Sequence, residues 1–201
     1  MQRLLPATVT VALLLIVGPA TSQDATPSQH ARSAAAVTPR QAANVETEPP
    51  QLAHLAGSYT LIGNQADNAT TIKNAIDAVT AGIGGLKKNV ARKRLEAVNT
   101  IVTRIEISSD RNKVTVGMND YVVTAPFDGS PVEAKTPAGE IAQASFQLKT
   151  ATLVQDIVQT KGRRENTFRF NSDGNLVMQV RETSPQLASA LSYSLVFRRG
   201  E

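Results

Sequence analysis

Residues 165–184 read ENTFRFNSDGNLVMQVRETS, and this stretch decides the fold class. An Asp-Gly turn at 173–174 separates two runs in which apolar and polar residues alternate. In the second run Leu176, Met178 and Val180 share one face. Alternation with a period of two indicates strands, and Asp-Gly favours a tight hairpin because glycine accepts a positive φ. The stretch therefore predicts two antiparallel strands with one face buried.

The same pattern extends outward in both directions. Turn segments at 109–112, 128–131 and 137–139 separate further short runs. Short connections make neighbouring strands antiparallel. A first strand is expected at 57–62. The other strand candidates are 101–108, 113–118, 121–125, 131–136, 140–149, 152–160, 165–171, 175–184 and 190–199.

One region between the first and second strands has a helical period instead. An apolar series spaced by three or four residues follows a possible N-cap at 67–68, and comprises Ile72, Ile76, Val79, Ile83, Leu86 and Val90. Glycines at 82, 84 and 85 interrupt it, and glycine is costly inside a helix. We expect two helices, roughly 69–81 and 86–97, joined by a hinge.

These elements predict a mainly β fold: an antiparallel up-and-down β-barrel of about ten strands. The helix-turn-helix after the first strand would lie as a lid across one open end. Closure into a barrel removes the two exposed edges that a meandering sheet otherwise leaves. A β-sandwich is the alternative. An outer-membrane barrel is disfavoured because the strands are short and carry outward charges such as Arg104, Glu106 and Arg181.

The order of elements resembles the calycin superfamily, which includes lipocalins and fatty-acid-binding proteins. The segments that carry the resemblance are 55–61 (LAGSYTL), 152–155 (TLVQ) and 173–177 (DGNLV). The resemblance implies a barrel that holds a small hydrophobic ligand. Fatty-acid-binding proteins commonly hold the ligand carboxylate with Arg-x-Tyr on the last strand and a further inward Arg. Here those positions match Leu195, Phe197 and a site near Phe170, so the resemblance does not imply this acid clamp.

The first 50 residues have a different composition from the rest. Arg3, an apolar run over 11–17 and small residues at 18–22 are typical of a cleaved signal peptide, predicted here at 1–22. Residues 23–50 have no aromatic, Leu or Ile, which predicts a disordered linker. The barrel domain is expected at 51–201. We therefore expect an exported protein, either periplasmic or secreted.

The composition excludes several kinds of functional site. The 201 residues include no Cys and only two His, with 21 Lys+Arg against 17 Asp+Glu. A disulfide scaffold, a thiol nucleophile, a Cys-ligated zinc and a multi-His metal site are excluded. His54 is the only His in the domain and has no evident nucleophile beside it. We expect no catalytic residues, no metal, no cofactor and no enzymatic activity.

The ligand is expected to be a small hydrophobic molecule inside the barrel. The proposed lining consists of apolar residues on the late strands: Phe146, Leu148, Phe168, Phe170, Met178, Tyr193, Leu195 and Phe197. The same residues fit a filled core equally well. The alternative function is a ligand-free envelope module, structural or in contact with a protein partner.

The second helix carries a basic run beside Leu86, Val90 and Leu95. Its cations are Lys87, Lys88, Arg92, Lys93 and Arg94, and they suggest a face that approaches an anionic membrane surface. A solvated charged face is the alternative. A nucleic-acid partner is not expected, because no aromatics interleave with the run. Residues 161–164 (KGRR) are expected to form an exposed hairpin turn. The oligomeric state is left open.

Overall fold

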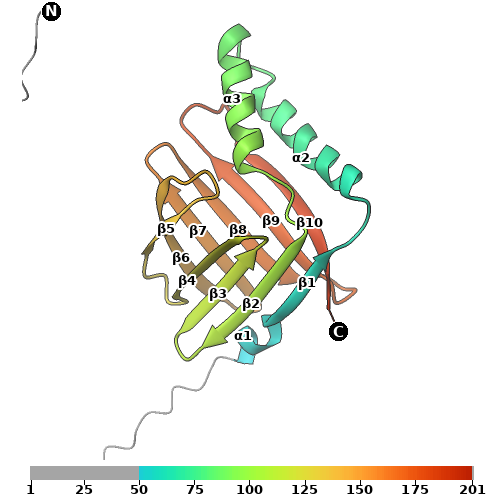
Figure 1. The fold of residues 1–201 in the computed structure, drawn as a ribbon, viewed down its shortest axis with the longest axis vertical. Helices are drawn as coiled ribbons and strands as arrows, with labels where there is room; N and C mark the ends of the chain where they lie inside the picture. Colours follow the sequence, from blue (N-terminus) through green and yellow to red (C-terminus); the bar gives the residue numbers. More distant parts are fainter. Residues whose placement is uncertain (1–49, 201) are drawn as a thin grey trace, which may run out of the picture. The chain divides into compact units, whose positions relative to one another are not determined.

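The structure, a computed structural model, describes residues 50–200 (Figure 1). The predicted signal peptide (1–22) and residues 23–49 of the predicted linker lie outside the described residues. The elements in chain order are α1 (Pro50–Leu55), β1 (Gly57–Leu61), α2 (Gln65–Thr80), α3 (Gly85–Val98), β2 (Arg104–Asp110), β3 (Lys113–Met118), β4 (Tyr121–Pro126), β5 (Val132–Lys135), β6 (Ile141–Lys149), β7 (Thr152–Gln159), β8 (Gly162–Phe170), β9 (Leu176–Thr183) and β10 (Leu191–Arg199).

All ten strands form one antiparallel sheet that curls into a nearly closed barrel. Their order is β4-β3-β2-β1-β10-β9-β8-β7-β6-β5, so β1 joins the last strand to the second. Sequence neighbours pair throughout, with β4 and β5 the exception: no ladder joins these two edges. The prediction of a mainly β, up-and-down barrel with a helix pair after the first strand is confirmed.

Several element boundaries differ from the expectation. The helix predicted from 69 begins at Gln65, because the Asn64 side chain, rather than 67–68, accepts a hydrogen bond from the Ala66 amide (2.8 Å). The strand predicted from 165 begins at Gly162. Arg163 and Arg164 therefore lie in β8, paired with Thr183 and Glu182, and the exposed turn predicted at 161–164 is wrong for these two residues. The pairing of β7 with β8 continues up to the turn at 160–161, so both arginines belong to the sheet.

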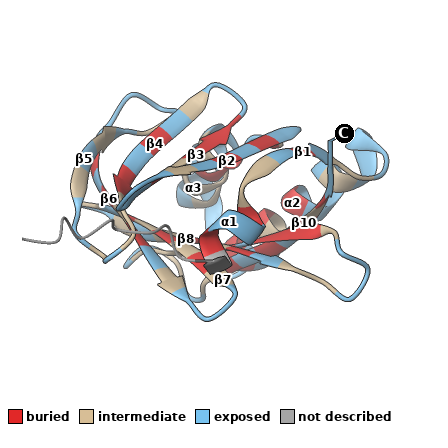
Figure 2. Ribbon diagram, turned by 90° about the horizontal axis from the view of Figure 1, so that it is seen from below, coloured by how far each residue is buried: buried red, intermediate tan, exposed pale blue. Residues whose placement is uncertain are grey.

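One end of the barrel is filled by α1, which lies across the opening (Figure 2). Leu52 and Leu55 are fully buried there, among aromatic side chains of the core. The Arg199 Nη2 atom donates to the carbonyls of His54 (2.6 Å) and Ala56 (3.0 Å), and Tyr59 donates to the carbonyl of Leu55 (2.6 Å). These bonds satisfy carbonyls at the end of α1 and fix it to the barrel.

The helix pair lies toward the opposite end, with α2 against β10 (Figure 1). The predicted apolar stripe is buried only along α2, through Ile72, Ile76 and Val79. On α3 only Leu95 is buried, while Leu86 is 80% exposed and Val90 is 52% exposed. Two apolar residues of α3, Leu86 and Val90, therefore face solvent. None of the described helices is long and apolar enough to cross a bilayer.

Candidate functional site

The eight residues predicted to line a ligand cavity all face the barrel interior. Phe146, Phe168, Met178 and Phe197 have no accessible surface, and Leu195 has almost none. Tyr193 is buried, and Leu148 and Phe170 are half-buried against the same core. None of the eight lines either of the two cavities described below. An internal void large enough for a ligand would leave accessible area on its lining. Their role in binding stays a prediction, because in this structure they form a packed core.

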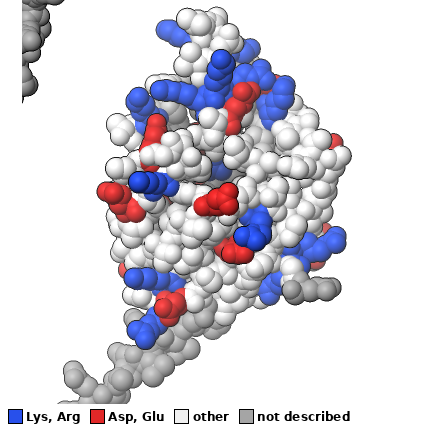
Figure 3. Space-filling model, in the orientation of Figure 1, with Lys and Arg blue, Asp and Glu red and all other residues white. Residues whose placement is uncertain are grey.

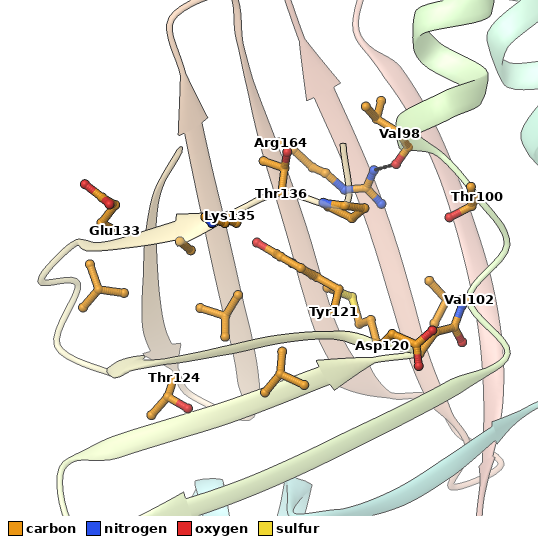
Figure 4. Close-up of a pocket in the computed structure, with 17 residues that line it drawn as sticks. Val98, Thr100, Val102, Asp120, Tyr121, Thr124, Glu133, Lys135, Thr136 and Arg164 are labelled. Atoms are coloured by element: carbon orange, nitrogen blue, oxygen red, sulfur yellow. Dashed lines mark hydrogen bonds between the residues drawn. The ribbon is translucent and has the colours of Figure 1, made fainter. Parts of the chain in front are cut away.

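The larger cavity lies elsewhere, where the barrel wall is not closed by hydrogen bonds (Figure 4). It has a volume of about 700 Å³ and lies between β4 and β5, with the end of α3 and one residue of β8 completing it. Its apolar lining is Val98, Val102, Met118, Val122, Val123, Val132, Ala134 and Pro137; its polar lining is Thr100, Asn119, Asp120, Tyr121, Thr124, Glu133, Lys135, Thr136 and Arg164. We call this cavity the cleft.

Arg164 marks the helix-side end of the cleft, and protein groups hold its guanidinium. Its Nη1 atom donates to the carbonyl of Val98 and to Oδ1 of Asn99, both at 3.0 Å. Its Nε atom donates to Oδ1 of Asn166 (3.0 Å), and Nη2 donates to the Tyr193 hydroxyl (3.3 Å). The side chain is only 17% exposed. These bonds connect β8 and β10 to the end of α3.

Further polar side chains extend this network. Tyr193 donates to Oδ1 of Asn99 (3.1 Å), and Asn99 donates to a Glu182 carboxylate oxygen (3.0 Å). That carboxylate lies 4.0 Å from Arg164 and supplies the compensating charge. Asn166 also donates to Gln155, with both side chains fully buried. The barrel interior is thus polar at the level of Arg164 and apolar toward α1.

Two tyrosines lie near the same guanidinium. Burial raises the pKa of Tyr121, and the positive charge of Arg164 partly opposes the shift. Burial also raises the pKa of Tyr193, again opposed by Arg164 and by its hydrogen bond. Both phenols are therefore neutral near pH 7. The Tyr121 hydroxyl is buried without a hydrogen-bond partner, whereas the Tyr193 hydroxyl is bonded.

A smaller cavity of about 210 Å³ adjoins the other side of the α3 end. It lies between α3, the turn before β6, the turn between β7 and β8, and the loop between β9 and β10. Ala91, Leu95, Ala138 and Leu187 contribute apolar surface to it. Val98 and Arg164 line this cavity and the cleft alike.

The basic face predicted on α3 is present on the surface, and Figure 3 shows Lys and Arg gathered over the helix pair. Lys87, Lys93 and Arg94 are exposed and form no ion pair within residues 50–200, and Lys88 is half-buried. Arg92 differs from them. It forms ion pairs with Asp77 (2.9 Å) and Glu96 (2.8 Å), so its positive charge is compensated within the helix pair.

Arg164 is a cleft residue that sequence reasoning misplaced, because KGRR was assigned to a turn. A usable signal was present: Arg164, Asn166, Phe168 and Phe170 have the same parity along one strand. Extending the alternation of β8 backward places Arg164 on the inner face. The cleft gave no comparable signal, since a gap between two edges depends on how the whole sheet closes.

Other types of site find no support in the geometry. Within residues 50–200 no three His, Asp or Glu side chains are grouped closely enough to hold a metal ion. His54 is exposed and packs its ring edge against Phe170, with 4.8 Å between ring centroids. The cleft is therefore the most developed site of the described chain.

Comparison with known proteins shows similarity in structure and not in sequence. No protein-family model matches the chain, and no curated protein matches it. Among solved structures, the wild-type fluorescent protein UnaG has a TM-score of 0.50 at 14% identity, covering 74% of this chain and 99% of that chain. The chain shares the barrel fold of this structure.

Other solved structures align over the same span. The REP1-NXSQ fatty acid transporter has a TM-score of 0.48 at 17% identity, covering 74% of this chain and 98% of that chain. A Schistosoma mansoni fatty acid binding protein in complex with arachidonic acid has a TM-score of 0.45 at 14% identity, covering 75% and 99%. At these identities the likeness concerns the fold alone.

Proposed function

We propose that this protein is an exported binding protein for a small hydrophobic molecule, and that it catalyses no reaction. The observation that carries the proposal is the cleft of about 700 Å³ in the barrel wall. Sites for small molecules commonly measure about 300–1,000 Å³ and combine an apolar lining with a few polar groups. The cleft lies in this size range. Apolar and polar residues contribute about equally to its lining, with valines along its walls and Tyr121 and Arg164 among its polar groups.

Binding would be driven by desolvation. Transfer of apolar ligand surface from water is worth roughly 25 cal/mol per Å² before the costs of association. The cleft suits this because its apolar lining comes from both flanking strands, including Val123 of β4 and Val132 of β5.

Two further parts of the proposal concern where the protein works. The signal-like segment at 1–22 supports export to the periplasm or the medium. The exposed face of α3, formed by Leu86, Val90, Lys87, Lys93 and Arg94, supports transient contact with an anionic membrane. Lipid bilayers are a natural source and destination for a hydrophobic ligand.

The test fills the cleft with a matched pair of variants. Val132→Phe places a larger side chain in the cleft, where Val132 is half-buried opposite Ala144. Val158→Phe makes the same change on an outward position of β7 that lines neither cavity. We expect Val132→Phe to weaken binding of an environment-sensitive apolar dye roughly fivefold or more, since steric misfit costs about 1–3 kcal/mol. Val158→Phe should bind like the unaltered protein.

Native mass spectrometry, followed by organic extraction, identifies any molecule that the protein carries when purified. A stoichiometric apolar molecule, retained by Val158→Phe and lost from Val132→Phe, supports the proposal. If the unaltered protein binds neither dye nor lipid, the binding function is wrong. The packed aromatic core then favours a ligand-free envelope module.

A further inference from the structure

We propose that Arg164 is the end wall of the cleft and sets the maximum length of the ligand. This inference rests on the proposed function and adds a determinant of specificity. The cleft and the smaller cavity, about 700 Å³ and 210 Å³, share two lining residues, Val98 and Arg164. A side chain that lines two cavities from both sides lies between them.

The hydrogen bonds of Arg164 favour a wall over a ligand anchor. All three guanidinium nitrogens donate to protein acceptors, namely Val98, Asn99, Asn166 and Tyr193. Glu182 supplies a nearby negative charge. A cation held and compensated in this way gains little from a ligand carboxylate, but it is rigid. The bonds keep the side chain between the two cavities, and its volume there blocks the extension of an apolar chain.

The neighbouring network keeps the wall in place. Asn99 bonds to Glu182 and accepts from Tyr193, so the end of α3, β8, β9 and β10 are connected at this point. The carbonyl of Val98, the last residue of α3, accepts a hydrogen bond from Arg164. Arg164 therefore separates the two cavities and also anchors the end of α3 to the barrel.

The consequence is a limit on ligand length. Each methylene that enters an apolar site raises affinity about fourfold. In the unaltered protein this increase should continue until the ligand chain reaches Arg164 and then stop. Shortening Arg164 should join the two cavities and allow the increase to continue into the second one.

The experiment uses straight-chain alcohols, from hexanol to hexadecanol, that compete with a bound environment-sensitive dye. Alcohols are uncharged, so the charge of Arg164 does not determine the result. Arg164→Ala removes the wall. Arg164→Met loses the same hydrogen bonds but fills a similar volume, so it is the matched control. We expect a chain-length limit in the unaltered protein and in Arg164→Met, and a limit several carbons longer in Arg164→Ala.

A second variant tests the same idea from the other cavity. Ala91→Phe, which fills the smaller cavity, should restore the short limit when combined with Arg164→Ala and should change nothing alone. If Arg164→Ala does not fold, Arg164→Val, which suits a strand, takes its place.

The possible outcomes separate the wall from the binding function. Equal chain-length limits in all variants would overturn the proposal that Arg164 is a wall. They would leave the proposed binding function intact. Arg164→Met behaving like Arg164→Ala also overturns it, since bonding and not volume would then matter. Absence of any dye or alcohol binding by the unaltered protein overturns both proposals.

Discussion

At the scale of single residues, Tyr121 and Tyr193 place the same group in two different environments. Each hydroxyl is buried near Arg164, yet Tyr193 bonds to Asn99 and to Arg164 while Tyr121 has no partner. A buried hydroxyl without a partner destabilises the folded state, whereas a paired one contributes modestly to it. The two tyrosines therefore offer a controlled comparison.

Replacing each tyrosine by phenylalanine should have different effects on the free energy of unfolding. Tyr193→Phe should lower the free energy of unfolding by about 1–3 kcal/mol, because Nη2 of Arg164 loses its acceptor and Oδ1 of Asn99 loses one of its two donors. Tyr121→Phe should leave it unchanged or raise it slightly. Urea unfolding followed by circular dichroism measures both. A large loss in Tyr121→Phe would mean that its hydroxyl has a partner, such as an ordered water.

At the scale of elements, α3 buries little apolar surface. Leu95 is its single buried residue, and the Arg164 network holds its last turn. The hinge before it is open, with Gly85 at φ +53° and no neighbouring atom where a Cβ would lie. The exposed Leu86 and Val90 thus belong to a helix with few constraints.

We predict that this helix mediates membrane contact. Lys87→Gln with Lys93→Gln should weaken binding to vesicles of mixed phosphatidylcholine and phosphatidylserine roughly thirtyfold, since each cation contributes about 1 kcal/mol. Vesicle sedimentation measures this effect. The control changes Lys113 and Lys149, two exposed lysines on strands, in the same way. Equal losses of vesicle binding in the two double variants would mean that net charge, and not the position of the lysines on α3, determines binding. Absence of vesicle binding by the unaltered protein would contradict a membrane role.

At the scale of the whole molecule, the opening between β4 and β5 determines where a ligand can lie. The other neighbouring strands share ladders, while β4 and β5 each pair on one side only. Backbone amides at such edges lack the protection of a second strand. The barrel is therefore least stable at the place where the cleft lies.

Hydrogen exchange should reveal this difference directly. We expect peptides covering β4 and β5 to take up deuterium well before peptides covering β8 and β9, which have partners on both sides. A bound dye should slow exchange in β4 and β5 most. Uniform protection across the four strands would indicate that the barrel closes in solution.

The sequence by itself determined the class of this fold and the order of its elements. Alternation, Asp-Gly turns and short connections are local signals, and they predicted the hairpins, the helix pair and the meander. The inward positions of Phe146, Phe168 and Phe197 followed from the same alternation. Local patterns report which face of a strand is apolar because that face must be buried.

The tertiary structure decided the rest, because it depends on contacts between distant residues. Whether the aromatic residues enclose a void or pack together depends on how α1 fills the barrel end. The cleft arises because β4 and β5 meet without a ladder, and no short segment contains that fact. Arg164 became a wall because the end of α3, β9 and β10 converge on it, which gives a surface-type residue buried partners.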